Sequence, residues 1–194
     1  MSEPPAYLKA FRELIRSEPT FNHLPLMEME FYGESDRAVI LLSAALAELG
    51  LEVALKKLFR EDMSAEDLFD WNGPLGDFAG KIKLSFALSL FNQTTKHDLD
   101  LIRQLRNGFA HSRHPLQFAS PQVANMCRHL KLPDTQHAQI PTAYITRAKD
   151  VAAARDLKNP KTRYVTTCNT IAVELVTFGR PPAGSRALTP PLLP

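Results

Sequence analysis

The stretch ESDRAVILLSAALAELGLEVALKKLF, residues 34–59, decides the fold of this chain. Its apolar residues recur at helical spacing and form one broad stripe, which includes Leu42, Leu46, Leu49 and Val53. A stripe of that width predicts a long helix that packs against more than one neighbour. Gly50 lies inside this helix and costs roughly 1 kcal/mol relative to Ala, so we expect it to allow a close helix crossing.

Similar patterns predict helices along most of the chain, separated by turns that contain proline or glycine. Thr94 or Thr95 is the expected N-cap of one of them. The Thr- and Val-rich segment before the C-terminal tail is assigned to helix because of its length. No segment in the first 130 residues has the pattern of a strand. The sequence therefore predicts an all-α fold, a single helical bundle, with helices near residues 7–16, 34–59, 64–70, 78–90, 95–111, 121–131, 142–156 and 163–178.

Composition and prolines divide the chain into four parts. Residues 1–29 are expected to form an N-terminal helix and loop, and residues 30–132 the core of the bundle. Residues 133–178 form a partly irregular, basic C-terminal segment that packs on the core. Residues 179–194 contain five prolines and are expected to be disordered or extended.

Composition also restricts the class of protein. The chain has 44% hydrophobic and 23% charged residues, as is usual for a soluble globular protein. We find no apolar run of membrane-spanning length and no signal peptide at the N-terminus, so a cytoplasmic location is expected. Cys127 and Cys168 are far apart in sequence and lack metal-ligand spacing, which predicts two reduced, buried thiols and neither a metal nor a cofactor.

Charge is distributed unevenly along the sequence. Residues 1–100 carry 17 acidic and 10 basic side chains, whereas residues 101–194 carry 4 acidic and 13 basic ones. A basic surface that meets phosphate or an acidic partner would explain this difference, and so would two halves that face each other. The cations of the second half are spread along the sequence and do not form one cluster.

The sequence RNGFAH, residues 106–111, is the strongest candidate for chemistry. It places a guanidinium, an amide and an imidazole near the end of an amphipathic helix that Pro115 cannot continue. Arg106 and His111 are five residues apart, about 140° around an ideal helix. They would reach one phosphate only if the last turn unwinds at Gly108 or if a second copy of the chain takes part.

Two interpretations of this motif stay open. In a metal-independent ribonuclease, His111 would transfer a proton and Arg106 would bind the phosphate, beside Asn107. In a structural role, Arg106 would be buried and paired with a carboxylate of a neighbouring helix, while His111 would cap its own helix. Glu34 or Asp36 is the expected carboxylate. In the functional variant Asp36 would orient His111.

The glycine-containing segment NGPLGD, residues 72–77, is a further candidate because anions bind at helix N-termini. The segment lacks the Lys-Ser/Thr pair of a phosphate-binding loop, however. A tight turn followed by a helix capped by Asp77 is the better interpretation.

Three segments together resemble the mannitol operon repressor family: ESDRA at residues 34–38, NGPLGDFAGKI at 72–82 and IRQLRNGFAHS at 102–112. The resemblance covers about residues 30–132. It implies an all-helical protein of transcriptional repression without a recognisable helix-turn-helix. The Arg-Asn-x3-His motif is also similar to that of the HEPN superfamily, whose helical domains often dimerise and include metal-independent RNases.

The leading hypothesis is a cytoplasmic regulator of the mannitol-repressor type that acts through protein–protein contacts and does not read DNA bases. We expect a homodimer and a DNA-binding or other regulatory protein as partner, with no membrane. The alternatives are a HEPN-type endoribonuclease of a toxin or defence system, which would bind RNA through Arg106, Asn107 and His111, and a helical binding module without catalysis.

Overall fold

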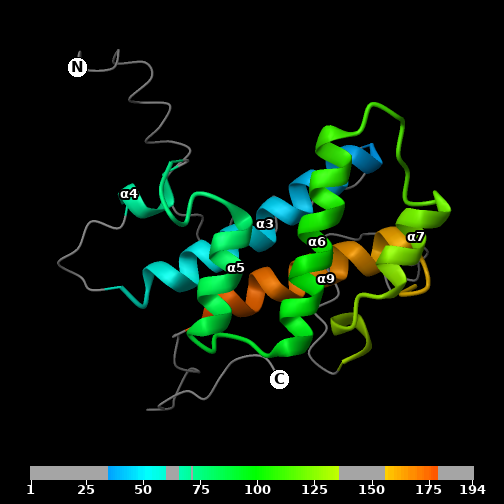
Figure 1. The fold of residues 1–194 in the computed structure, drawn as a ribbon. Helices are drawn as coiled ribbons and strands as arrows, with labels where there is room; N and C mark the ends of the chain where they lie inside the picture. Colours follow the sequence, from blue (N-terminus) through cyan, green and yellow to red (C-terminus); the bar gives the residue numbers. More distant parts are fainter. Residues whose placement is uncertain (1–34, 60–65, 71, 136–155, 179–194) are drawn as a thin grey trace, which may run out of the picture.

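The computed structural model describes residues 35–59, 66–70, 72–135 and 156–178, and every regular element within them is a helix. The predicted all-α fold is confirmed. The helices expected at residues 7–16 and over most of 142–156, and the proline-rich tail, lie outside the described residues. Figure 1 shows the elements α3 (Asp36–Lys56), α4 (Glu66–Phe69), α5 (Phe78–Ala87), α6 (Gln93–His111), α7 (Pro121–Arg128), the 3-10 turn η1 (Leu132–Asp134) and α9 (Pro160–Thr177).

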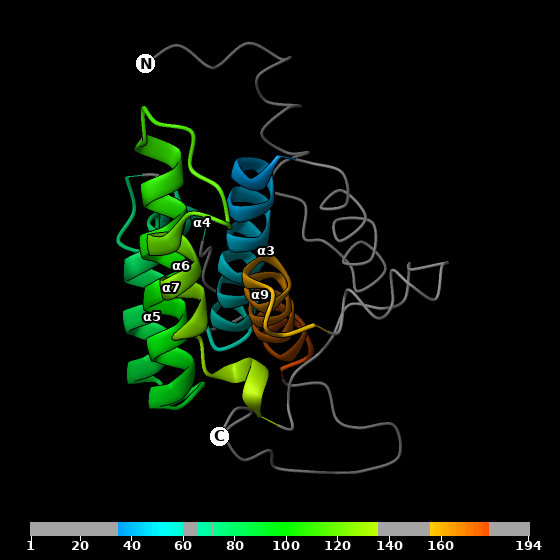
Figure 2. The ribbon, with the colours of Figure 1, turned by 90° about the vertical axis from the view of Figure 1, so that its right-hand side faces the viewer.

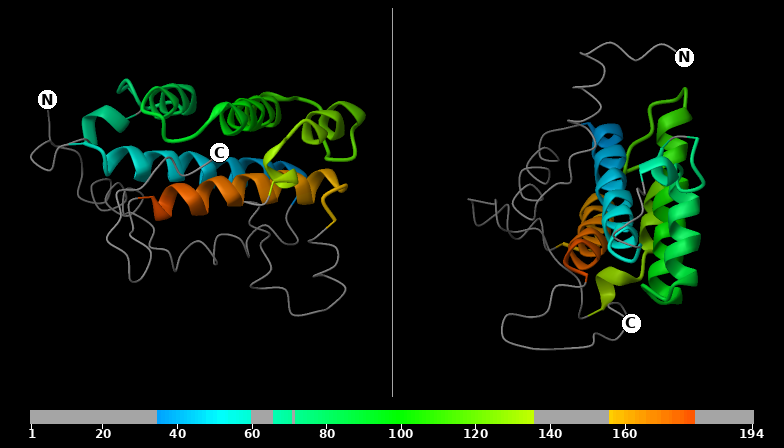
Figure 3. Two further views of the ribbon diagram at one scale, coloured as in Figure 1. Left: turned by 90° about the horizontal axis from the view of Figure 1, so that it is seen from below. Right: turned by 90° about the vertical axis from the view of Figure 1, so that its left-hand side faces the viewer.

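The described helices form two layers. Helices α3 and α9 lie side by side in one layer, and α5, α6 and α7 lie across them in the other (Figures 2 and 3). Helices α3 and α9 approach each other closely at Gly50, where an added Cβ would lie 3.1 Å from Cα of Ala172 and 3.3 Å from Cβ of Leu175. The close helix crossing predicted for Gly50 is therefore confirmed.

Helix α3 is a central helix because it packs against α9 in its own layer and against α5 and α6 in the other. Ser35 caps its N-terminus by accepting a hydrogen bond from the backbone N–H of Ala38 at 3.2 Å. The expectation that no apolar run has membrane-spanning length was wrong for this helix, which contains an 18-residue window of mean hydropathy 2.0. Of that window 61% is buried inside the protein, so the apolar residues of α3 largely face the core of the bundle.

Helix α9 is the second central helix, although it lies beyond residue 132, where the sequence suggested a segment on top of the core. Tyr164, Cys168 and Ile171 of α9 are fully buried. The hydroxyl of Tyr164 donates a hydrogen bond to the carbonyl oxygen of Ile40 at 3.1 Å. Lys57 donates to the carbonyl oxygen of Val176 at 2.7 Å, so that both ends of α9 are tied to α3 or to its C-terminal turn.

Helix α6 connects the second layer to the rest of the bundle. Asn92 caps it by accepting hydrogen bonds from the N–H groups of Thr94 and Thr95, so the cap lies two residues before the earlier of the two expected positions. Asp98 in α6 is fully buried and accepts hydrogen bonds from the backbone N–H groups of Lys131 and Leu132, both at 2.8 Å. A single carboxylate thus holds the segment between α7 and η1 against α6.

Both cysteines are buried and free. Burial raises the pKa of the Cys127 thiol to about 12 and also raises the pKa of Cys168 well above its ordinary value. The prediction of two reduced, buried thiols agrees with this environment.

Candidate functional site

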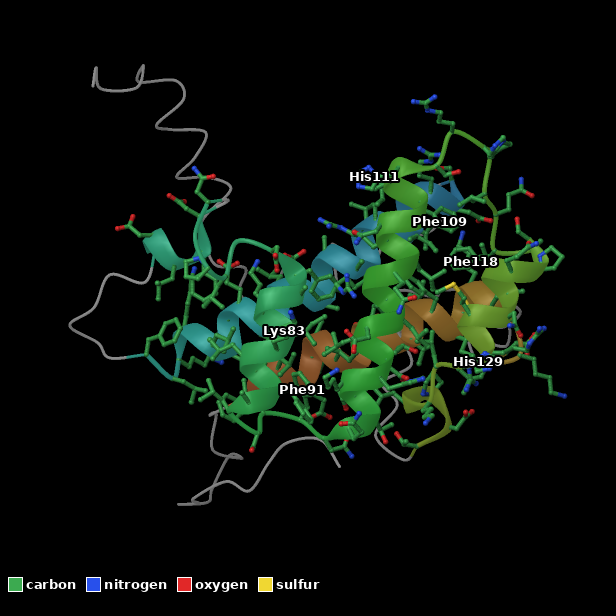
Figure 4. All side chains as sticks on the ribbon, in the orientation of Figure 1. Lys83, Phe91, Phe109, His111, Phe118 and His129 are labelled. Carbon is green, nitrogen blue, oxygen red and sulfur yellow. The ribbon has the colours of Figure 1, made fainter. Side chains whose placement is uncertain are left out.

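The C-terminal part of α6 carries the candidate residues Arg106, Asn107 and His111 (Figure 4). The helix continues through His111 and ends at Ser112, whose N–H donates to the carbonyl oxygen of Gly108 at 2.9 Å. The last turn therefore does not unwind. Within one copy of the chain, the side chains of Arg106 and His111 start about 140° apart around the helix.

Arg106 pairs with a carboxylate that the sequence did not indicate. Its Nη2 lies 3.8 Å from Oε2 of Glu48 in α3, and its Nη1 donates a long hydrogen bond of 3.5 Å to the amide oxygen of Asn107. The Arg106 side chain is 41% exposed. The expected substantial burial and the pairing with Asp36 are thus not what the structure has, and Glu34 lies outside the described residues.

Glu48 belongs to a layer of ion pairs between the two helix layers. Lys81 of α5, whose side chain is only 7% exposed, lies 3.0 Å from Oε1 of Glu48 and 3.2 Å from Oε2 of Glu52. Glu52 also pairs with Lys56 one turn further along α3 at 3.0 Å. Arg106 is the outer member of this network. A buried lysine needs such partners because an unpaired buried ammonium is costly.

The sequence contained a signal for this network. Glu48 and Glu52 are four residues apart inside an otherwise apolar helix, so they share one helix face. Lys81 likewise interrupts the apolar pattern of α5. Charges at such positions indicate partners on a neighbouring helix, but they do not say which helix that is.

Asp36 has a different role from either of those expected. Its Oδ2 accepts a hydrogen bond from the backbone N–H of Phe118 at 2.8 Å, and its Oδ1 lies 3.9 Å from Nζ of Lys161. The next residue, Arg37, donates to the carbonyl oxygen of Ser112 at 2.9 Å. Asp36 therefore joins the start of α3 to the loop after α6 and to α9, and it contacts neither Arg106 nor His111.

His111 is exposed, and its side chain makes no hydrogen bond or ion pair with the other residues that the structure describes. Phe109, on the opposite side of α6, is buried and contacts Phe118 with ring centroids 6.4 Å apart (Figure 4). One copy of the chain thus offers an arginine already paired with Glu48 and an imidazole on another side of the helix. Bringing both to one phosphate would require a second copy.

The glycine-containing segment before α5 is a tight turn. A Cβ at Gly73 would lie 2.4 Å from the carbonyl oxygens of Asp67 and Leu68, so the chain passes too closely there for any side chain. Asp77 caps α5 by accepting a hydrogen bond from the N–H of Gly80. Because a carboxylate already occupies this helix N-terminus, the segment offers little to an anion. Among the described residues no group of three or more His, Cys, Asp or Glu side chains is placed to hold a metal ion.

The fold of this chain is similar to that of a solved structure. A chain in the X-ray structure of the MtlR-HPr complex from Escherichia coli matches with a TM-score of 0.59, and the match covers 80% of this chain and 97% of that one at 19% identity. At that identity the likeness shows the fold alone.

Sequence comparison identifies the family. The model of the mannitol repressor family matches residues 29–176, so the chain belongs to the mannitol repressor family. The match includes α9 and extends well past residue 132, where the resemblance in the sequence ended. The chain is 31% identical over 86 residues to the mannitol operon repressors of Escherichia coli K12 and of strain CFT073. The aligned stretch spans 44% of this chain and 44% of those relatives.

Proposed function

We propose that this protein is a cytoplasmic regulator of the mannitol-repressor type, which acts through protein–protein contacts. The observation that carries the proposal is the family match over residues 29–176, which takes in both central helices. A reporter fused to the controlled promoter tests it. Deletion of the gene is expected to raise expression, and unchanged expression at every candidate sugar operon would contradict the proposal.

The proposed protein partner is a protein of the HPr type. The structural relative was solved in a complex with HPr, and the structural match covers 80% of this chain. Calorimetric titration of the purified protein with HPr from the same cell is expected to give saturable binding, and an unrelated small protein of similar charge serves as control. An absence of heat and of any other binding signal at about 100 μM, a concentration at which even weak protein pairs associate, would refute this partner.

Direct reading of DNA bases forms no part of the proposal. In the described residues the helices that carry cations pack within the bundle, and none stands out as a basic recognition helix. Repression would then run through a partner that holds the DNA. Sequence-selective binding of operator DNA that survives physiological salt would contradict this.

A homodimer through α6 fits the exposed face that contains Gly108. Gln104, Gly108 and His111 are all exposed and share one helix face. An added Cβ at Gly108 would meet nothing within 4 Å, so no contact among the described residues requires a glycine there, although it costs about 1 kcal/mol relative to Ala. A second copy that approaches this face closely would explain it.

Light scattering tests the homodimer. The native protein is expected to be a dimer at micromolar concentration, Gly108→Arg a monomer, and the matched control Ala87→Arg on the exposed end of α5 a dimer. A monomeric native protein, or a Gly108→Arg protein that still dimerises, would overturn the proposal.

The ribonuclease hypothesis stays a prediction with its own test. Arg106 would have to leave Glu48, and a second copy would have to supply His111, before both could act on one phosphate. Incubation with RNA in the presence of chelator is the assay. Cleavage that disappears in His111→Ala with the fold intact would make the protein a metal-independent endoribonuclease, with Arg106 and Asn107 beside the phosphate.

A further inference from the structure

Six of the eight Lys and Arg residues that the structure describes in the second half, although dispersed in the sequence, gather at one end of the folded protein. The start of α3, the turn after α6, the end of α7 and the start of α9 all lie at the end that faces the viewer in Figure 2. We call this surface the basic end. Its exposed or half-exposed cations are Arg37, Arg113, Arg128, Lys131, Lys158 and Lys161.

Specific contacts hold these segments together. Arg37 is bonded to Ser112, the neighbour of Arg113, at 2.9 Å, and Asp36 lies 3.9 Å from Lys161. Arg163 lies one helical turn after Asn159, the N-cap of α9. Its guanidinium donates hydrogen bonds to the carbonyl oxygen of Leu130 and to the carboxylate of Asp134. The surface is therefore continuous from the turn after α6 to the segment after α7.

Few carboxylates neutralise this end. With the buried Arg163, and with Asp98 counted because it bonds to the backbone of Lys131, this end has seven Lys and Arg residues against four Asp residues, and the rest of the described chain has seven Lys and Arg against eight Asp and Glu. All four carboxylates are engaged: Asp36 with Phe118 and Lys161, Asp98 with the backbone N–H groups of Lys131 and Leu132, Asp134 with Arg163, and Asp156 with the backbone N–H of Lys158. An excess of cations on one surface attracts a polyanion and steers it there.

The apolar side chains decide which kind of polyanion fits. Tight protein interfaces depend on exposed apolar or aromatic anchors. The large exposed hydrophobic residues of the described chain, Leu58 and Leu88, follow the C-terminal ends of α3 and α5, which are not part of the basic end. Single-stranded nucleic acid stacks on exposed aromatic rings, but Phe109, Phe118 and Tyr164 near this end are buried. Contact with the phosphates of a duplex needs only the cations.

From these observations we propose that the basic end binds the phosphate backbone of double-stranded nucleic acid without reading its sequence. The inference rests on charge and exposure at this end and is independent of the proposed HPr partner. The phosphate contact would be a second contact, beside that with HPr, for a protein that has no base-reading element among its described residues. Such a contact would keep the regulator on DNA while a partner supplies the specificity.

Fluorescence anisotropy with a labelled duplex of about 30 base pairs tests this proposal. If about five phosphates are contacted, the affinity should fall by about two to three orders of magnitude between 50 and 200 mM salt. A duplex of scrambled sequence should bind equally well. Each of the substitutions Arg113→Glu, Arg128→Glu, Lys131→Glu and Lys158→Glu should weaken binding of both duplexes and lower the salt slope by about 1.

The matched control is Lys83→Glu, the same change of charge at an exposed lysine of α5 that lies away from the basic end (Figure 4). Circular dichroism and the unfolding midpoint confirm that each variant is folded, and HPr binding is measured separately. Failure of the duplex to bind at 50 mM salt would refute the proposal. So would an equal loss in Lys83→Glu, or binding of polyglutamate in place of the duplex, which would identify an acidic protein as the partner.

Discussion

The carboxylate of Asp98 is expected to contribute more to stability than its short side chain suggests. It is fully buried in α6 and accepts hydrogen bonds from the backbone N–H groups of Lys131 and Leu132 at 2.8 Å each. Asp98→Ala removes the acceptor and leaves two N–H groups without a partner, that of Leu132 buried and that of Lys131 part-buried. Because each such group costs about 1–3 kcal/mol, we expect the substitution to lower the free energy of unfolding by about 4 kcal/mol.

Asp100, two residues further along the same helix, provides a matched control. Its side chain is 36% exposed and pairs with Lys96 one turn earlier at 2.8 Å. A half-exposed i,i+4 pair of this kind contributes about 0.3–0.5 kcal/mol, so Asp100→Ala should leave the stability almost unchanged. Asp98→Asn keeps the shape and one acceptor oxygen but loses the charge, and it should lie between the two Ala variants.

Urea denaturation of the three variants measures these differences, and amide hydrogen exchange shows where they arise. In the native protein the amides of Lys131 and Leu132 should exchange slowly, and in Asp98→Ala they should exchange fast while the amides of α6 stay protected. The reasoning would be refuted if Asp98→Ala and Asp100→Ala differed by less than about 1 kcal/mol, since two orphaned N–H groups cost more than that.

Three further outcomes are expected. Gly50→Ala should destabilise the protein by about 1 kcal/mol or more in urea, since a Cβ only 3.1 Å from Cα of Ala172 outweighs the gain in helix propensity, and a stabilised variant would contradict this. Burial raises the pKa of Cys127 to about 12, so its thiol should resist a thiol reagent at pH 8 until urea unfolds the chain; rapid labelling of the native protein would be inconsistent with it. The hydrogen bond from Arg163 lowers the pKa of Asp134 below its ordinary value of 3.8, so its stabilising contribution is present above that value and is lost as the pH falls through the folded-state pKa. Asp134→Asn should therefore lose less stability than the native protein on acidification below about pH 4. Identical dependence of the two stabilities on pH would count against the Asp134–Arg163 ion pair.

The sequence by itself determined the helices of the described region and the family. Apolar spacing placed α3 and α6 within about three residues of their observed ends, because helix periodicity and capping depend on neighbouring residues. Gly50 indicated a close crossing, since a glycine inside a helix needs a reason. The motifs at residues 34–38, 72–82 and 102–112 indicated the mannitol repressor family, which the match over residues 29–176 confirms.

Only the tertiary structure decided which side chains meet. Arg106 pairs with Glu48 and not with Asp36, and the cations of four separate segments form one basic end. Helix α9, which the sequence placed on top of the core, lies at its centre beside α3. These contacts depend on the angle and register at which helices cross. Crossing is governed by the fit of whole helix surfaces, and that fit involves residues more than a hundred positions apart, as in the bond from Tyr164 to Ile40.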